Sequence, residues 1–314
     1  MLKILITGGT GFIGQHLVDA LQATDRYSVV VATTRAQKPQ KAGVEYRHIE
    51  DIGPTTDWEP LLYDIDIVIH AAARAHVLRE EVDNPIDEFR TTNVQGTKRL
   101  AHACRTEEVG RFIYLSSIGV NGNSTERSPF SLHDLPNPQE PYAQSKWEAE
   151  QILKQLFGDA ETELVVVRPP LVYGPEAPGN FGLLSKVIQY GIPLPFAGIN
   201  NARSFVSVWN LIDLISACIE APNADNATFL VRDGEDISTS ELLQKMALAQ
   251  GRNPRLFWVP STLLKAAATL VGKKQMYDRL FESLQVDDSA TCETLGWEPP
   301  MSLDEGIKRS FSAE

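Results

Sequence analysis

The chain has 314 residues, of which 43% are hydrophobic and 22% are charged, so it is long enough for a sizeable core and for more than one domain. Its formal net charge of −12 disfavours broad electrostatic attraction to nucleic acid or to an anionic membrane, although a local basic pocket can still hold phosphate. We therefore expect small molecules or other protein chains as partners.

The cysteines and the N-terminus exclude several further classes of protein. Cys104, Cys218 and Cys292 lie far apart without zinc-ligand spacing, so we expect reduced structural thiols and no metal site. The apolar run before the first glycines is too short for a signal peptide, and no later stretch approaches the length of a membrane span. We expect a cytoplasmic protein that has no membrane partner.

The first half of the chain alternates short apolar runs with amphipathic stretches. Strands are expected at 3–7, 28–33, 66–72, 111–117 and 163–169, and helices at about 13–23, 93–109 and 142–157. Strands rich in Val and Ile that are separated by helices are typical of a parallel sheet buried on both faces. The pattern predicts an α/β protein with a Rossmann-type doubly wound parallel sheet.

After residue 168 the pattern becomes less regular. The Pro- and Gly-rich stretch at 169–180 predicts a loop, and further elements are expected: helices at 181–191, 240–250, 261–271 and 302–311, and strands at 204–208 and 228–231. We interpret 263–272 as a buried or packing helix. The expected domains are a dinucleotide-binding domain at 1–168, to which 204–220 returns, and a smaller α/β nucleotide-sugar-binding domain at 169–314.

A glycine-rich loop follows the first expected strand. Gly9, Gly11 and Gly14 satisfy G-x-G-x-x-G, and Gly8 with the last two gives a G-x-x-G-x-x-G variant. Such glycines let the backbone approach a pyrophosphate at the positive end of the following helix. The alternative is a chance Gly-rich turn, but the position between a strand and a helix predicts dinucleotide binding.

The end of the second expected strand bears on the choice of cofactor. Thr33 and Thr34 stand where an NAD-binding chain usually has an acidic residue, and Arg35 follows them. A guanidinium can pair with a 2′-phosphate, which favours NADP(H). NAD(H) remains the alternative, in which Arg35 is a solvated loop charge.

Candidate catalytic residues stand in two segments. Tyr142 and Lys146 are four residues apart at the start of an expected helix, so they share a face, and a neighbouring ammonium lowers the pKa of a phenol. Ser117 ends the fourth expected strand at the edge where open α/β sheets bind ligands, and we prefer it to Ser116. Its alternative role is to cap the strand.

Taken together, the motifs resemble the extended short-chain dehydrogenases/reductases, and among them the nucleotide-sugar epimerases and reductases. The resemblance covers nearly the whole chain, through TGGTGFIG, HAAA at 70–73, NVQGT at 93–97, YAQSK at 142–146, RPPLVYGP at 168–175 and RSFVSVWNLIDL at 203–214. It implies that Ser117 and Tyr142 hydrogen-bond the sugar oxygen that reacts, that Tyr142 transfers the proton, and that Lys146 also holds the nicotinamide ribose.

The resemblance also implies two sets of binding residues. The cofactor set is Gly8, Thr10, Gly11, Phe12, Ile13, Gly14, Thr33, Thr34, Arg35, Asp51, Ile52, Ala71, Ala72, Ala73, Asn93, Ser116 and Pro169. The substrate set is Arg74, His76, Asn121, Asn180, Arg203 and Arg279. Alternatively, Asp51 is a turn residue, the alanines allow close packing, and Asn180 hydrogen-bonds loop backbone. His76, like His70, is structural or lines a pocket. Arg203 stands in an otherwise apolar strand and needs an anion, for which substrate phosphate is preferred.

The resemblance leaves several reactions open. Related dehydratases carry an acidic pair after the active-site Ser or Thr, whereas Ile118 and Gly119 follow here, so dehydration is disfavoured. We favour NAD(P)H-dependent reduction of the C4 keto group of a UDP-(N-acetyl)-hexos-4-ulose in bacterial polysaccharide biosynthesis. One alternative is an NAD-dependent 4-epimerase acting on UDP-glucose or UDP-N-acetylglucosamine, and another is a non-catalytic NADP(H)-binding regulator. We also expect a homodimer formed through the helices at 93–109 and 142–157.

Overall fold

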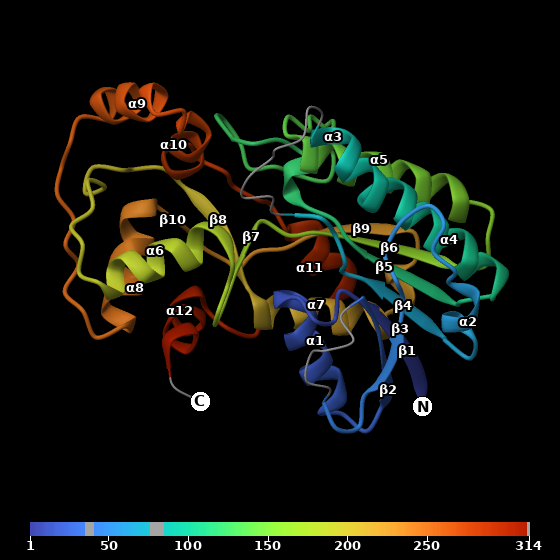
Figure 1. Ribbon diagram of the computed structural model, residues 1–314. Helices are drawn as coiled ribbons and strands as arrows, with labels where there is room; N and C mark the ends of the chain where they lie inside the picture. The colour runs from blue at the N-terminus through green and yellow to red at the C-terminus, as the bar shows by residue number, and fades with distance from the viewer. Residues whose placement is uncertain (35–40, 76–84, 313–314) are drawn as a thin grey trace.

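The computed structural model describes residues 1–34, 41–75 and 85–312 and divides into two sheets with their helices (Figure 1). The larger sheet has seven strands, with each neighbouring pair parallel, in the order β3-β2-β1-β4-β5-β6-β9. Its strands are β1 (Leu2–Thr7), β2 (Tyr27–Thr33), β3 (Glu45–His48), β4 (Ile67–His70), β5 (Arg111–Leu115), β6 (Glu163–Arg168) and β9 (Ala227–Leu230). The expected Rossmann-type fold is confirmed. The strand order reverses between β1 and β4, and such a point opens a ligand crevice at the carboxyl ends of the strands.

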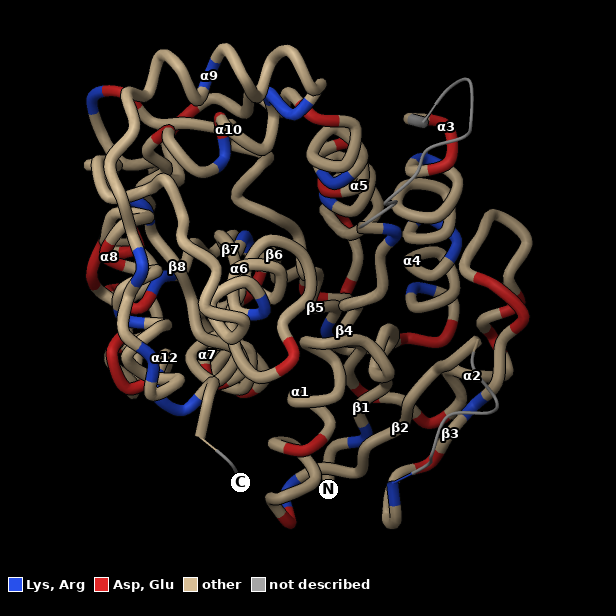
Figure 2. Tube along the Cα trace, turned by 60° about the vertical axis from the view of Figure 1, so that its left-hand side comes forward, with Lys and Arg blue, Asp and Glu red and all other residues tan. Residues whose placement is uncertain are grey.

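Helices cover both faces of this sheet, as the alternation of side chains along a strand requires. Ile4 and Ile6 of β1 pack in one core with α1 (Phe12–Gln22) and α7 (Val208–Glu220). Leu5 points to the other core, which includes residues of α2 (Glu59–Leu62), α4 (Thr97–Thr106) and α5 (Pro141–Phe157). Helices α4 and α5 lie side by side, as Figures 1 and 2 both show. The helices on both faces hold the large sheet in place, and the candidate site lies at the carboxyl ends of its strands.

The smaller sheet has the order β10-β8-β7, with β10 (Asp236–Ile237) antiparallel and β7 (Leu171–Tyr173) parallel to β8 (Arg203–Ser207). Its core packs against α6 (Gly179–Gln189), α8 (Thr239–Ala249) and α12 (Leu303–Phe311). Strand β7 lies in the stretch that we expected to be a loop. Its Pro and Gly residues flank the three paired residues and do not interrupt them, so the short strand pairs with β8.

The remaining elements differ most from expectation. The helix expected from residue 93 begins as a π-helical segment, Arg90–Gly96, which follows α3 (Pro85–Phe89) and runs into α4. Helices α10 (Lys274–Phe281) and α11 (Ser289–Leu295) were not predicted. Helix α9 (Ser261–Leu270) has no buried residue, so of the two roles predicted for 263–272 the buried helix is wrong, whereas the helix does contact α10. Across the described ranges, no helix has the length and apolarity that crossing a membrane requires.

Candidate active site

The glycine-rich loop joins β1 to α1 at the point where the strand order reverses. Gly8 has a φ of +73°, and a Cβ there would lie 2.7 Å from the backbone nitrogen of Ala72. A Cβ on Gly14 would overlap the carbonyl oxygen of Gly8, which instead accepts a hydrogen bond from the Gly11 nitrogen at 2.8 Å. Residues other than glycine therefore do not fit this tight turn.

The loop is suited to an anionic cofactor. Helix α1 starts at Phe12 directly after the loop, so the positive end of its dipole lies at the loop, and no acidic residue in its first turn offsets that charge. Ala71 and Ala72 come within contact distance of Gly8 from the end of β4. The atoms in contact are backbone atoms, so the two chain segments run close together at this point. The residues present fit the pyrophosphate of a dinucleotide.

His70 lies beneath this loop and is structural. Its Nδ1 is 2.6 Å from the Thr7 hydroxyl and its Nε2 is 2.8 Å from the Thr97 hydroxyl, so the ring connects β1, β4 and α4. Burial, with the Lys146 charge as a smaller cause, lowers the pKa of His70 to about 3. The imidazole is neutral at physiological pH and is fully used by its two partners.

Asn93 positions the chain after β4. It lies in the π-helical segment, and its side-chain oxygen and nitrogen bond the backbone nitrogen and oxygen of Arg74 at 2.8 and 3.1 Å. Its nitrogen also donates to the Ser145 hydroxyl at 2.9 Å, which ties the loop to α5. The Arg74 guanidinium reaches Glu88 at 3.3 Å. π-Helical turns occur frequently at functional sites, and this one holds a loop at the crevice.

Ser117 follows β5 and lies beside the start of α5. Its hydroxyl accepts a hydrogen bond from the Gly119 nitrogen at 3.1 Å. A Cβ on Gly119 would lie 3.2 Å from the Ala143 Cβ and 3.4 Å from the Ser117 Oγ, so this glycine lets the serine approach the helix. The Ile118 nitrogen donates to the Pro169 carbonyl at 2.9 Å and fixes the loop further. The sequence analysis used Gly119 only to disfavour dehydration and missed this spacing role.

Tyr142 and Lys146 share one face of α5, as their spacing predicts. Lys146 is 2% exposed, and its ammonium donates a hydrogen bond to the Leu115 carbonyl at 2.7 Å. The ammonium nitrogen lies 4.5 Å from the ring centroid of Tyr114 and 5.9 Å from the ring centroid of Tyr142. Burial lowers the pKa of Lys146 to about 7. Burial also raises the pKa of Tyr142 to about 12, so the expected lowering of the phenol pKa is wrong for this state. The ammonium faces a carbonyl, and desolvation of the phenolate dominates.

A buried charge network that the sequence analysis missed supports this helix. Glu150 accepts hydrogen bonds from Ser116 at 2.5 Å and from two nitrogens of Arg168 at 2.9 and 2.5 Å. Arg168 also donates to the Asn121 side chain at 2.9 Å. Ser116 and Asn121, which we expected in the cofactor and substrate sets, have these protein partners. The signal for Glu150 was its position four residues after Lys146.

Two arginines face the site from the smaller half of the molecule. Arg203 of β8 is 9% exposed and donates to the Glu282 carbonyl at 2.8 Å, and burial lowers its pKa to about 10. Within the described ranges no carboxylate lies within ion-pair distance of its guanidinium. Arg279 of α10 forms an ion pair with Glu140, the residue before α5, at 2.6 Å. A buried cation whose one hydrogen-bond partner among the described residues is a carbonyl is a fitting site for an anion.

The other expected binding residues are spread around the crevice. Asp51 accepts a hydrogen bond from the Thr56 hydroxyl at 3.1 Å, which is the turn role we kept as its alternative. The Ile52 side chain lies against Gly96, and Asn180 is half-buried in the first turn of α6. Thr33 is buried at the end of β2 and Thr34 is exposed. Arg35 and His76 lie outside the described residues, so their roles stay predictions.

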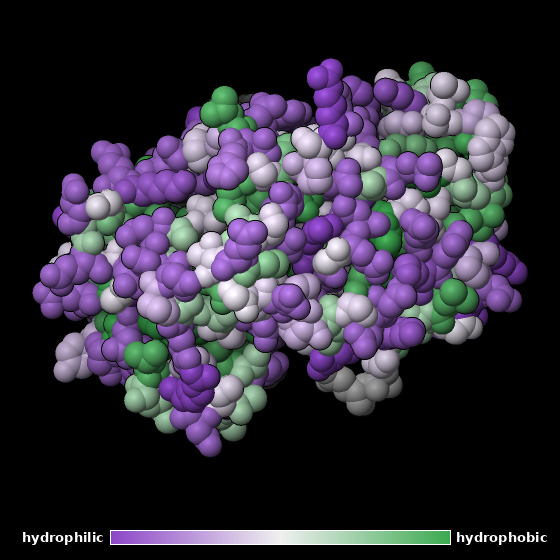
Figure 3. Space-filling view, turned by 180° about the vertical axis from the view of Figure 1, so that it is seen from behind, coloured by the Kyte–Doolittle hydropathy of each residue, from purple (hydrophilic) through white to green (hydrophobic). Residues whose placement is uncertain are grey.

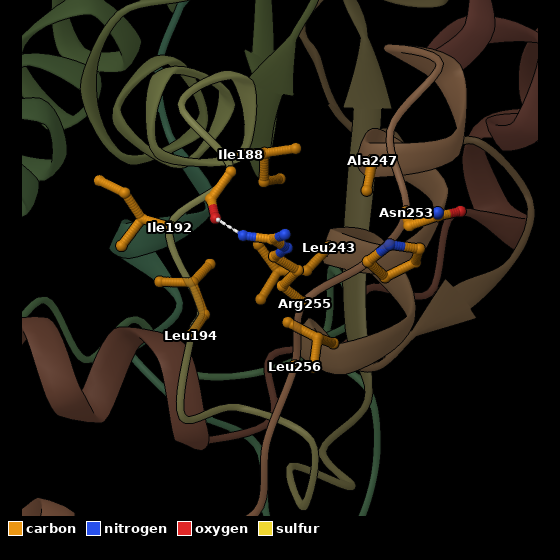
Figure 4. Close-up of a pocket in the computed structure, with 10 residues that line it drawn as sticks. Ile188, Ile192, Leu194, Leu243, Ala247, Asn253, Arg255 and Leu256 are labelled. Carbon is orange, nitrogen blue, oxygen red and sulfur yellow. Dashed lines mark hydrogen bonds between the residues drawn. The ribbon is translucent and has the colours of Figure 1, made fainter.

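A cavity distant in the fold from these residues lies between α6, α8 and residues 253–256 (Figure 4). It has a volume of about 10 Å³, and Arg255 crosses it to donate to the Gly191 carbonyl at 3.1 Å. It is too small for a sugar. The crevice at the end of the large sheet is the candidate active site.

The chain belongs to the NAD dependent epimerase/dehydratase family, whose model matches residues 4–231. It is 42% identical over 313 residues to a UDP-glucose 4-epimerase of Vibrio cholerae, covering 99% of this chain and 95% of the relative. It is 25% identical to the N-acetyl-alpha-D-glucosaminyl-diphospho-ditrans,octacis-undecaprenol 4-epimerase of Escherichia coli O157:H7, covering 99% and 95%. The crystal structure of a UDP-glucuronic acid 4-epimerase from Bacillus cereus in complex with NAD superposes with a TM-score of 0.80 at 24% identity, covering 99% and 96%.

Membership of this family makes the chain an enzyme of the NAD dependent epimerase/dehydratase type. The relative at 42% identity favours the 4-epimerase alternative over the 4-ketoreductase interpretation that we preferred from the sequence. The family is NAD dependent, and no comparison supports the preference for NADP(H).

Proposed function

We propose that the chain catalyses the interconversion of UDP-glucose and UDP-galactose by epimerisation at C4, with NAD as its cofactor. The identity of 42% over 99% of the chain to a UDP-glucose 4-epimerase carries this proposal. The glycine loop, the serine, the tyrosine and the lysine supply the groups that the reaction needs.

Each residue has a role in moving one proton. Tyr142 removes the proton from the C4 hydroxyl as that carbon is oxidised, and returns it when the carbonyl is reduced from the opposite face. Ser117 holds the same oxygen through its hydroxyl, and the buried Lys146 ammonium favours the phenolate. NAD, when bound on the glycine loop, supplies reversible hydride acceptance. Because burial raises the pKa of Tyr142 to about 12 in the free chain, the phenol must first release its own proton to solvent before it can accept the proton of the C4 hydroxyl, and a nearby cation lowers the cost of that release.

The diphosphate of the substrate is assigned to Arg203. This guanidinium is buried, has one carbonyl partner and lies on the strand next to β7. The Escherichia coli relative is named for a sugar linked through diphosphate to a lipid, so a diphosphate beside the sugar is common to both relatives' substrates. Asn180 and Arg279 are secondary candidates for the same group.

The test is conversion of UDP-glucose by the purified chain, followed by chromatographic separation of UDP-galactose. Tyr142→Phe should lower turnover at least about 100-fold while NAD binding is retained, because general acid–base catalysis contributes about that much. Tyr190→Phe, at a tyrosine that is 78% exposed, is the matched control. Conversion that Tyr142→Phe leaves unchanged would refute the assignment.

The reductase alternative predicts a different outcome. A 4-keto sugar would be reduced with consumption of NADPH or NADH, and the freshly purified chain would release little cofactor on denaturation. An epimerase that keeps its cofactor should release nearly one NAD per chain. A regulator would bind NADP(H) and show neither conversion.

Dimerisation through α4 and α5, and a cytoplasmic location, complete the proposal. The two helices lie side by side on one face of the large sheet, where a second pair could form a four-helix interface (Figure 2). The mass in solution, measured by light scattering, tests the dimer.

A further inference from the structure

Helix α9 and the residues around it expose an unusual number of apolar side chains. Six large apolar residues in 257–276 are exposed: Phe257 (47%), Trp258 (67%), Leu263 (62%), Leu270 (87%), Val271 (70%) and Met276 (38%). We call residues 257–276 the α9 surface. Figure 1 shows α9 at the outer rim of the smaller half, and Figure 3 shows hydrophobic residues reaching the surface in that region, at the upper right.

The helix is amphipathic in a way that its contacts with the protein do not explain. Leu263, Ala266, Ala267 and Leu270 recur at helical spacing and share a face, and all four are exposed. On the side toward the protein, Leu264 and Ala268 are only half-buried. A hollow of about 310 Å³, lined in part by Trp258 and Phe281, lies at the start of the helix. The apolar face of α9 therefore points outward.

The charge of this region is opposite to that of the whole chain. The α9 surface, residues 257–276, contains three lysines and no Asp or Glu, whereas the chain carries a net charge of −12. Lys265, Lys273 and Lys274 are exposed and, among the described residues, have no carboxylate within ion-pair distance. Figure 2 shows basic but no acidic residues along α9.

We propose that the α9 surface docks the protein on the surface of an anionic phospholipid bilayer. An exposed helix with apolar residues on one face and lysines beside it fits an interface that offers acyl chains below a layer of negative headgroups. A second copy of this chain docked on the same surface would bring its own lysines against Lys265, Lys273 and Lys274, whereas anionic headgroups offer the opposite charge along the whole helix. The docking is peripheral, because α9 is far too short to span the membrane.

The segment that leads into α9 is well anchored, so the surface has a fixed position. Backbone hydrogen bonds join Leu194 to Arg255 at 2.8 Å and Phe257 to Leu194 at 3.0 Å. Arg255 also donates to the Gly191 carbonyl (Figure 4). After α9, the chain enters α10, whose Arg279 reaches Glu140 at the start of α5. Docking at α9 would thus hold the active-site crevice close to the membrane.

The test is co-sedimentation of the full chain with vesicles of phosphatidylglycerol and phosphatidylcholine, compared with vesicles of phosphatidylcholine alone. The chain should bind the anionic vesicles and lose that binding at high salt, since interaction with each lysine is screened. Lys273→Gln with Lys274→Gln should weaken binding about 30-fold, from about fivefold for each lysine near the surface. Leu263→Ser with Leu270→Ser should weaken it at least about tenfold.

Matched controls separate the α9 surface from general effects. Leu135→Ser removes an apolar side chain that is 88% exposed elsewhere, and Lys308→Gln removes an exposed lysine of α12. Neither should change vesicle binding. The proposal would be overturned if the chain did not bind anionic vesicles, or if the controls lost as much vesicle binding as the α9 variants. It would also be overturned if the Leu263/Leu270 variant changed its oligomeric state without a change in vesicle binding.

The same samples keep this proposal distinct from the proposed function. All four variants should convert soluble UDP-glucose at the rate of the unaltered chain, because none of the replaced residues touches the crevice. Failure of every sample to convert the sugar would refute the epimerase proposal and leave the membrane result standing.

Discussion

The buried ion pair between Glu150 and Arg168 makes Glu150→Gln the most informative single substitution. The Glu150 side chain is 0% exposed and that of Arg168 is 5% exposed, and the two share two hydrogen bonds. Loss of the charge leaves Arg168 buried without its counter-ion, which costs about 3–5 kcal/mol in comparable sites. We expect the free energy of unfolding in urea to fall by that amount.

The same substitution should change the active site through Lys146. Glu150 lies four residues along α5 and raises the pKa of Lys146, in opposition to the burial that lowers it. Without the carboxylate the pKa falls further below about 7, so less ammonium is present at neutral pH. The alkaline limb of the profile of kcat against pH should therefore move to lower pH.

Two comparisons decide whether this reasoning holds. Glu148→Gln alters a partly exposed carboxylate of the same helix, whose pairing with Arg90 should be worth less than about 1 kcal/mol. Glu150→Gln combined with Arg168→Met should recover much of the lost stability, because no charge is left unpaired. An equal cost for the two glutamates, or an unshifted pH profile in the folded Glu150→Gln variant, would refute the role given to Glu150.

Three further predictions concern the core, the glycine loop and the substrate site. Burial lowers the pKa of His70 to about 3 in the folded chain, against about 6.5 when unfolded, so its contribution to stability is present above pH 6.5 and is lost as pH falls toward 3, by up to about 1.4 kcal/mol per pH unit. In urea unfolding, the stability of His70→Gln should therefore depend less on pH between 6.5 and 5 than that of the unaltered chain. The exposed His102→Gln is the control and should not show this change. Gly14→Ala should abolish NAD binding measured by calorimetry, whereas Gly110→Ala, where a Cβ has ordinary contact distance, should keep it. Arg203→Gln should raise the KM for UDP-glucose about 10- to 100-fold with a smaller change in kcat, because a hydrogen bond to a charged group contributes about 1.5–3 kcal/mol; an unchanged KM would remove Arg203 from the diphosphate site.

The sequence predicted the large sheet well because its strands are buried on both faces. Residues 29–32 and 164–167 are continuous apolar segments, and the helices between the strands have clear periodicity. Strand β7 escaped prediction because three residues between prolines and glycines carry no periodic signal, and its pairing with β8 is a tertiary contact. Helix α9 was placed correctly along the chain, but apolar composition alone does not say which side is covered.

In the candidate site, too, the features set by local sequence were predicted, whereas those that depend on tertiary contacts were not. Gly8, Gly14 and the Tyr142–Lys146 spacing follow from local geometry, and the structure assembles them at one edge of the sheet. The direction of the Lys146 ammonium depends on the Leu115 carbonyl, which is 31 residues away in sequence. Burial in the folded core, which the sequence does not show, raises the pKa of Tyr142, so the sequence predicted the lowering of that pKa incorrectly.

The ion pair between Arg279 and Glu140 has a mechanical consequence. It joins α10 to the residue that precedes the catalytic helix, yet the Arg279 side chain is 50% exposed and that of Glu140 is 26% exposed. An ion pair in such contact with water contributes no more than about 1 kcal/mol and weakens with salt. Its opening therefore costs little when product must leave, and while closed it connects α10, the helix that follows α9, to the residue before the first turn that carries Tyr142.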